Sequence, residues 1–369
     1  MKATSLKDLD IYDKATIVLS SITKDLADSV YAELGGTLNF AWSIEPRVSA
    51  WAESDNDPDS APKHRVVMCY ELARQLYRDV EKYHLFGESD LLEEPYKTFF
   101  KAFKYPPVFQ NHIDKLDSIW NMFIGALTWV FFHEIGHLAQ EHGYIRNKFG
   151  GQTLETRIED CESHGTQELG EKESVISHVT EFAADVEAIQ WCVQELIRHF
   201  LPKDENTDES ILKEFQSNLF LLVCGISCVL YRFNGDRLLE PQEHPVLSHP
   251  TPIRRLEVCL PNIFEKLDLG GHGQKLHQLS RSDLVYLCSD AANSAGFFWL
   301  WHSRRNYIPD NFMIKGLLQD PFKTSYWKEI LTAWDEVEPD IRKIRRFGSS
   351  FGILSFTAEF RLEIFKDNI

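Results

Sequence analysis

The sequence predicts an α+β fold that is mostly helical, with one small antiparallel sheet. Apolar residues recur every three to four positions through most of the 369 residues, which is typical of helices with one buried face. Leu38–Ser54 is instead rich in aromatic and β-branched residues, and the stretch after His64 passes from strand character into an amphipathic helix. A hydrophobic fraction of 43% is enough for one large core or two modest ones.

Charge and cysteine content exclude several classes of protein. A formal net charge of -17 would repel phosphate backbones, so we expect no direct nucleic-acid partner. The seven cysteines are scattered among apolar residues and are expected to be free thiols in a reducing compartment. The N-terminus carries acidic residues where a signal peptide needs a basic patch and an apolar run, so we expect a cytoplasmic protein.

Two apolar runs need to be tested against a membrane span. Residues 119–132 fall short of the roughly 20 residues that a span requires, and residues 215–231 are diluted by polar side chains. We therefore expect both to be buried helices and no stable membrane span. Peripheral membrane association stays open.

The pattern along the chain predicts two regions. Residues 1–261 are expected to form the main domain, and residues 262–369 a C-terminal helical region. Within the first region, the polar, acid-rich segment at about 150–173 is expected to be a solvated loop insert. It is followed by a long helix that begins near Ser174 and stops at Pro202.

The chemistry of the chain is concentrated in a helix that we expect to begin near Asp114. Its apolar stripe leads directly into His133, Glu134 and His137, which form the pattern H-E-x-x-H. Residues four apart share one face of a helix, so the two imidazoles can hold one ion, for which Zn²⁺ is the natural candidate. Glu134 would then act as general base on the water at the ion. The alternative is a pair of core histidines satisfied by hydrogen bonds.

A third ligand is expected from outside this motif. The pattern of the metzincin class is excluded, because Gln140 and Gly143 stand where it needs glycine and histidine. The later stretch EFAAD places Glu181 and Asp185 one helical turn apart beside small alanines that would let two helices approach closely. Glu181 is therefore the expected third ligand, with Asp185 accepting the free ring N–H of a ligand histidine.

Two neighbours of Glu181 are weaker candidates. His178 lies one turn earlier and is a competing ligand, whereas Glu187 is expected on another face.

These motifs resemble a known family. HEIGHLAQEH, EFAAD and SHPTPIRRL are similar to the gluzincin metallopeptidases typified by the CAAX prenyl endopeptidases and HtpX, and also to the soluble phage-exclusion protease group typified by Lit. The resemblance implies a zincin-like metallopeptidase fold, with the sheet above the H-E-x-x-H helix. It also implies that His249 and Arg255 stabilise the charge on the substrate carbonyl oxygen in the transition state. His142 matches a further histidine of that signature and is left without a role.

The resemblance extends upstream to SAWAES. In that family the equivalent stretch is an edge strand that lines the substrate cleft, which implies substrate contacts for Ser49, Ala50, Trp51 and Ala52. Ser49 replaces the family's usual asparagine, and the long membrane helices of the prenyl endopeptidases are missing. A soluble relative is therefore expected, and prenylated substrates are not implied.

The sequence thus predicts a zinc-dependent endopeptidase acting on a protein or peptide substrate. A latent form that needs a protein activator is a variant of this hypothesis. The alternative is a non-catalytic scaffold that keeps the fold and binds a basic partner through its acidic helical surface.

Overall fold

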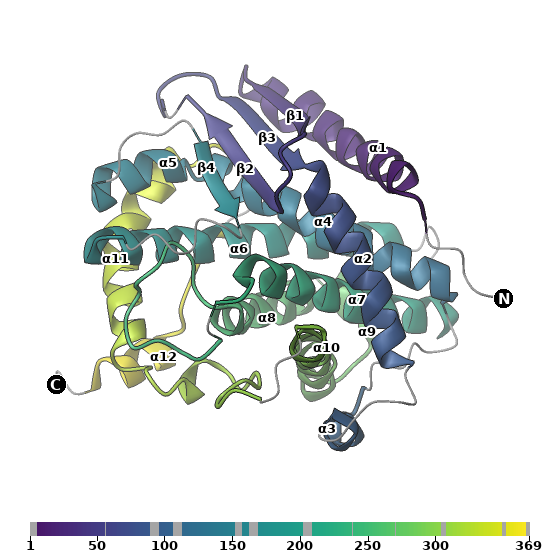
Figure 1. The fold of residues 1–369 in the computed structure, drawn as a ribbon. Helices are drawn as coiled ribbons and strands as arrows, with labels where there is room; N and C mark the ends of the chain where they lie inside the picture. The colour runs from purple at the N-terminus through teal and green to yellow at the C-terminus, as the bar shows by residue number, and fades with distance from the viewer. Residues whose placement is uncertain are drawn as a thin grey trace.

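A computed structural model describes residues 6–55, 57–88, 96–105, 113–151, 157–161, 169–201, 209–237, 239–269, 271–303, 308–348 and 352–366. Helices make up most of this part of the chain, and one four-stranded sheet lies along one side of it (Figure 1). The α+β class predicted from the sequence is confirmed.

The sheet is mixed, so the prediction of an antiparallel sheet was wrong. Its strands are β1 (Thr37–Ser43), β2 (Ser49–Ser54), β3 (Lys63–Cys69) and β4 (Arg157–Cys161), in the order β1-β3-β2-β4. β1 and β2 do not pair as a hairpin, because β3 inserts between them and runs parallel to β1. β2 is antiparallel to both β3 and β4.

The prediction of a loop at 150–173 was wrong for β4. Arg157–Cys161 pairs with β2 through its main chain, and Ile158 is buried. Main-chain pairing needs no apolar face, so a five-residue strand gives little signal in an acidic segment. The remainder of that segment lies largely outside the described residues.

The other elements of the described residues are helices. They are α1 (Asp8–Leu26), η1 (Ala27–Tyr31), α2 (Tyr70–Gly87), α3 (Tyr96–Ala102), α4 (Lys115–Ala139), α5 (His142–Ile145), η2 (Arg146–Gly150), α6 (Glu171–Phe200), α7 (Glu209–Asn234), α8 (Pro252–Asp268), α9 (His272–His277), α10 (Arg281–His302), η3 (Leu317–Gln319), α11 (Tyr326–Ile344) and α12 (Ala358–Ile364).

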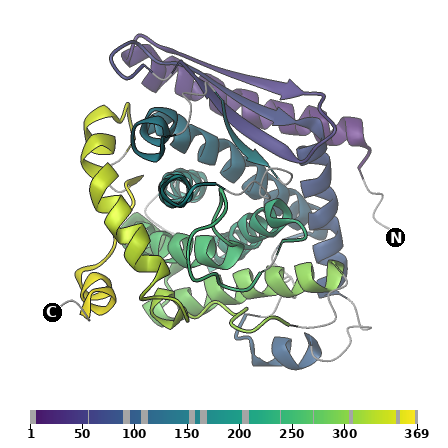
Figure 2. The same cartoon turned by 60° about the vertical axis from the view of Figure 1, so that its left-hand side comes forward.

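Helix α4 is the centre of the fold. It begins where predicted, with Leu116 donating its backbone N–H to the N-cap Asp114 at 2.7 Å. The sheet packs on one side of it and α6 and α7 on the other (Figures 1 and 2). Helices α4 and α7 are long and apolar enough to cross a membrane, but 89% and 78% of their most apolar windows are buried inside the protein.

Close contact between α4 and α6 depends on a glycine. A Cβ added at Gly136 would lie 2.9 Å from the carbonyl oxygen and 3.0 Å from Cα of Ala184. The small residues at both positions let the two backbones touch, as the alanines in α6 led us to expect. This contact brings the EFAAD segment to the H-E-x-x-H turn.

Two apolar clusters fill the interior. The larger one surrounds α4, and the smaller one joins the first half of α6 to α11 and α12 along the side of the molecule seen at the left of Figure 2. Pro261 lies inside α8, so the chain remains helical at the position where we placed a domain boundary. The division into residues 1–261 and 262–369 stays a prediction.

Candidate metal and active site

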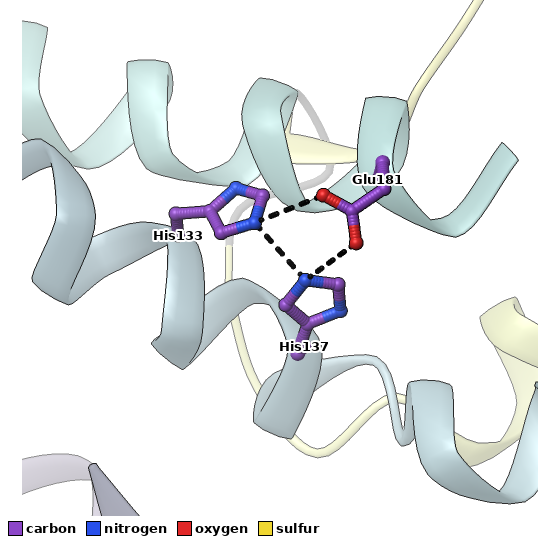
Figure 3. A group of neighbouring side chains, drawn as sticks. All are labelled: His133, His137 and Glu181. Carbon is purple, nitrogen blue, oxygen red and sulfur yellow. Dashed lines mark hydrogen bonds and ion pairs between the residues drawn. The ribbon is translucent and has the colours of Figure 1, made fainter. Parts of the chain in front are cut away.

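The predicted ligands meet at the contact between α4 and α6. His133 and His137 lie one turn apart on α4, with their Nε2 atoms 3.0 Å from each other. Glu181 of α6 lies opposite, with its Oε2 3.4 Å from Nε2 of His133 and its Oε1 3.4 Å from Nε2 of His137 (Figure 3). All three side chains are buried, and each offers a ligand atom within 4.8 Å of the other two. This group can bind a metal ion.

The outer ring nitrogen of each histidine has its own partner. Nδ1 of His133 lies 2.9 Å from Oδ1 of Asp185, the contact that the sequence predicted. Nδ1 of His137 lies 2.9 Å from Nδ1 of His142. If both ligand histidines carry a proton on Nδ1, two Nε2 lone pairs face each other across 3.0 Å. Either a proton or a metal ion must therefore lie between the two Nε2 atoms, and two imidazoles with a carboxylate opposite are a donor set that fits a metal.

The electrostatics of the two histidines differ. Burial alone lowers the pKa of His133, but its contacts with Asp185 and Glu181 outweigh burial and raise the pKa to about 10. Burial lowers the pKa of His137 to about 4, and His133 and Arg146 act in the same direction. Without an ion, one proton is therefore held on His133, beside the two carboxylates.

Two arginines and a histidine surround Glu181. Arg146 donates from Nη2 to its Oε1 at 2.6 Å, Nη2 of Arg255 lies 3.5 Å from its Oε2, and Nε2 of His249 lies 3.7 Å from its Oε1. Burial raises the pKa of this carboxyl group. The contacts with His249, His137 and His133 lower it by more, so the pKa lies well below its usual value. Glu181 is therefore ionised, as a ligand carboxylate must be.

Arg255 is bonded to Asp185, the residue that contacts His133. It donates from Nε and Nη2 to the two oxygens of Asp185, at 2.8 and 2.7 Å. Arg255, Asp185 and His133 thus form a continuous buried chain. The structure brings His249 and Arg255 to the ligand group, while their action on a substrate oxygen stays a prediction.

Glu134 is fully buried next to His133 on α4. The H-E-x-x-H spacing places it beside the ligand pair, where the proposed general base has to be. Its catalytic role also stays a prediction.

The expected edge strand was wrong in one respect. β2 carries Ser49, Ala50, Trp51 and Ala52, all buried, but it has β3 on one side and β4 on the other. β4 pairs with these four residues, so it occupies the position that an extended peptide would need for main-chain pairing. Substrate contacts for this strand stay a prediction.

The two weaker candidates for metal ligands, His178 and Glu187, have other partners. His178 points its Nδ1 at the hydroxyl of Tyr326, at 2.8 Å, and is not in the ligand group. Glu187 bonds to Trp191, Gln140 and Arg345. Sequence reasoning missed the role of Arg146 altogether; its place one helical turn after His142 was the available signal.

The comparisons with known proteins support a peptidase. The family model described as Peptidase U49 matches residues 88–263, somewhat less than half of the chain, and this segment contains the ligand group together with His249 and Arg255. Neither the curated proteins nor the solved structures gave a match. The class of protein that the site and this match support is therefore a hydrolase that cuts peptide bonds.

Proposed function

We propose that the protein is a zinc-dependent endopeptidase of the gluzincin type. The observation that carries the proposal is the pair of inward-facing Nε2 atoms with the carboxylate of Glu181 opposite them. Two imidazoles and one carboxylate are a ligand set that catalytic zinc uses, with a fourth position kept for water. The Peptidase U49 match favours this function over the scaffold alternative.

In this mechanism the ion, when bound, supplies Lewis acidity and a more acidic water. His133, His137 and Glu181 would hold it, and Asp185 would fix the ring of His133 through Nδ1. Glu134 takes the proton of the attacking water and returns it to the leaving amine. His249 and Arg255 are the groups assigned to the negative charge that develops on the carbonyl oxygen.

The decisive experiment replaces the proposed base. Glu134→Gln keeps the shape of the side chain but cannot accept the proton, so cleavage of an unfolded protein should fall by about 10²–10⁴-fold while zinc content is unchanged. The matched control is Glu214→Gln, an exposed glutamate, which should leave both quantities as in the wild type. Cleavage retained in the Glu134 variant would refute the mechanism, and a wild-type protein that binds no zinc would refute the cofactor.

We also propose that activity is restrained until a protein partner or a substrate engages the enzyme, in a cytoplasmic setting. Support comes from the burial of the ligand group and from β4, which covers β2.

A further inference from the structure

We propose that His142 and Arg146 are positioning residues, which set the orientation of two of the three metal ligands. They lie one helical turn apart, at the start of α5 and of η2. His142 contacts His137, and Arg146 contacts Glu181. The inference rests on the proposed metal site and assigns roles to two residues outside the ligand set.

The backbone after α4 places His142 in this position. Glu141 adopts the left-handed conformation, with φ of 52°, and ends α4 so that the chain turns directly into α5. His142 is fully buried, and its ring is 5.0 Å from that of His137 at an interplanar angle of 78°. The turn therefore returns a side chain to the helix that the chain has just left.

The proton arrangement follows from ligand chemistry. A metal at Nε2 of His137 requires the ring proton on Nδ1, which then donates to Nδ1 of His142. His142 must accept there, so it is neutral and carries its own proton on Nε2. Among the described residues that Nε2 has no hydrogen-bond partner.

Such a buried, half-satisfied imidazole destabilises the fold, and an apolar residue would avoid that cost. The contact with His137 explains why a histidine and not an apolar residue occupies position 142.

The two ligand histidines are thus held by different chemistry. His133 donates to the carboxylate of Asp185, whereas His137 donates to a neutral imidazole. A carboxylate makes the ring that it holds more basic, and a neutral acceptor fixes the ring without that effect. His142 therefore sets the tautomer and angle of His137 without adding charge.

Arg146 acts on the third ligand. Its Nη2 donates to Oε1 of Glu181 at 2.6 Å, and its Nε donates to Oγ1 of Thr180 at 2.8 Å. Two anchors on neighbouring residues fix the plane of the guanidinium and hence of the carboxylate. Oε2 of Glu181 has no hydrogen-bond partner among the described residues and remains for the ion.

The test for His142 uses Co²⁺ alone as the probe, since its visible absorption reports coordination geometry. His142→Leu removes the acceptor and should weaken Co²⁺ binding by about 10–100-fold and change the absorption spectrum of the bound ion. His142→Asn places an amide oxygen near the position of Nδ1 and should recover most of the affinity and the wild-type spectrum. The control is His84→Gln, a buried histidine bonded to the carbonyl of Val80, which should bind Co²⁺ as the wild type does.

The test for Arg146 must keep the charge, because removing a cation beside the site would by itself favour a metal. Arg146→Lys keeps the charge but cannot donate to both Thr180 and Glu181 in the same geometry. Thr180→Val leaves the arginine but removes its hydrogen bond to Oγ1 of Thr180. Both should weaken Co²⁺ binding by about tenfold and alter the spectrum. The control is Arg232→Lys, at a partly buried ion pair with Asp79, which should change neither the Co²⁺ affinity nor the spectrum.

The outcomes separate this inference from the proposed function. A wild-type protein that binds no Co²⁺ or Zn²⁺ overturns the metal site itself. Wild-type binding that is equalled in affinity and spectrum by His142→Leu, Arg146→Lys and Thr180→Val overturns the positioning roles and leaves the metal site standing. Thermal unfolding of each metal-free variant shows that a loss of binding is not a loss of folding, and rescue by His142→Asn supports the role of the acceptor.

Discussion

At the scale of single residues, the proton on His133 has a consequence for metal binding. With a pKa of about 10, the metal-free ring is charged at neutral pH, and ligation requires it to lose that proton. We predict that binding at pH 7 releases about one proton and that affinity rises about tenfold per pH unit between about pH 7 and 9.

Calorimetry of Zn²⁺ binding in buffers with different ionisation enthalpies measures this release directly. The same heat in every buffer would show that no proton leaves. His133 would then not be the group that titrates.

Gly136 gives a second prediction at this scale. In Gly136→Ala the new methyl group meets backbone atoms of Ala184, which cannot move aside. The free energy of unfolding should fall by about 1–3 kcal/mol, and metal affinity should fall with it because α4 and α6 are pushed apart.

Gly125 on the same helix is the matched control. Its added Cβ would first meet Cδ1 of Leu222, at 3.1 Å, and that side chain can rotate. Gly125→Ala should therefore cost less stability and leave metal affinity unchanged. Equal effects on metal affinity at the two glycines would contradict the role of close packing.

The sequence indicated the candidate metal ligands because helical spacing converts directly into a shared face. His133, His137 and Glu181 could be named from spacing and from small neighbours alone. Arg146 was not named, since its place one helical turn after His142 does not show that its side chain crosses to α6. Contacts between helices depend on packing that no local pattern encodes.

At the scale of elements, β4 provides a test of restraint. Its pairing with β2 covers the strand that the family resemblance assigns to substrate. In Ile158→Pro the ladder opposite Ala52 is weakened, so cleavage of an unfolded protein should rise severalfold.

The control is Ile158→Val, which keeps both the strand and the apolar side chain. Rates of peptide cleavage and the melting temperature are measured for both variants. Cleavage that stays the same or falls in a folded Ile158→Pro protein would show that β4 supports the site rather than restraining it.

Helix α8 carries a carboxyl group with pH-dependent stability. Burial raises the pKa of Glu257 to about 7, although its Oε1 accepts the backbone N–H groups of Lys315 and Gly316. A carboxyl group whose pKa is higher in the folded state stabilises the fold while it is protonated. That contribution, about 3 kcal/mol, is lost as pH rises from about 4.5 to 7.

Glu257→Gln accepts the same two bonds but does not titrate. Relative to the wild type, its free energy of unfolding should rise by up to about 3 kcal/mol between pH 5 and 8 in denaturant titrations. Glu265→Gln, at an exposed position on the same helix, should follow the wild-type pH profile. A wild-type profile in the Glu257 variant as well would rule out this carboxyl group as the source.

Element boundaries were predictable where side chains mark them. Asp114 caps α4, and α6 ends at Phe200, just before Pro202. The mixed sheet was not predictable, since the place of β3 between β1 and β2 is decided by tertiary pairing.

At the scale of the whole molecule, the C-terminal region is fastened to the end of α4. Arg346 donates its backbone N–H to the carbonyl of Ala139 at 2.8 Å and its Nε to Oε1 of Glu141 at 2.6 Å. Arg345 pairs with Glu187 on α6. Both carboxylates are buried, so each depends on its arginine.

We predict that Arg346→Ala lowers the free energy of unfolding by about 3–5 kcal/mol, because it leaves the carboxylate of Glu141 buried and unpaired. Arg342→Ala, at an exposed ion pair with Glu338, should cost less than about 1 kcal/mol. Chemical denaturation measures both. Equal losses would mean that the contacts of Arg346 contribute no more than a surface pair.

These long-range contacts could not be predicted from the sequence of the C-terminal region. Nothing in the stretch around Arg345 indicates a partner on α4 or α6, more than a hundred residues earlier in the chain. Composition and spacing indicated helices in this region, and only the fold shows which surface they cover.

Synthesis on the ribosome proceeds from the N-terminus, so the histidines of α4 and the carboxylates of α6 are made long before Arg345 and Arg346. Until residues 345 and 346 emerge, Glu141 and Glu187 lack the arginines that make their burial tolerable. The burial of these two carboxylates therefore becomes favourable only once residues 345 and 346 have been made.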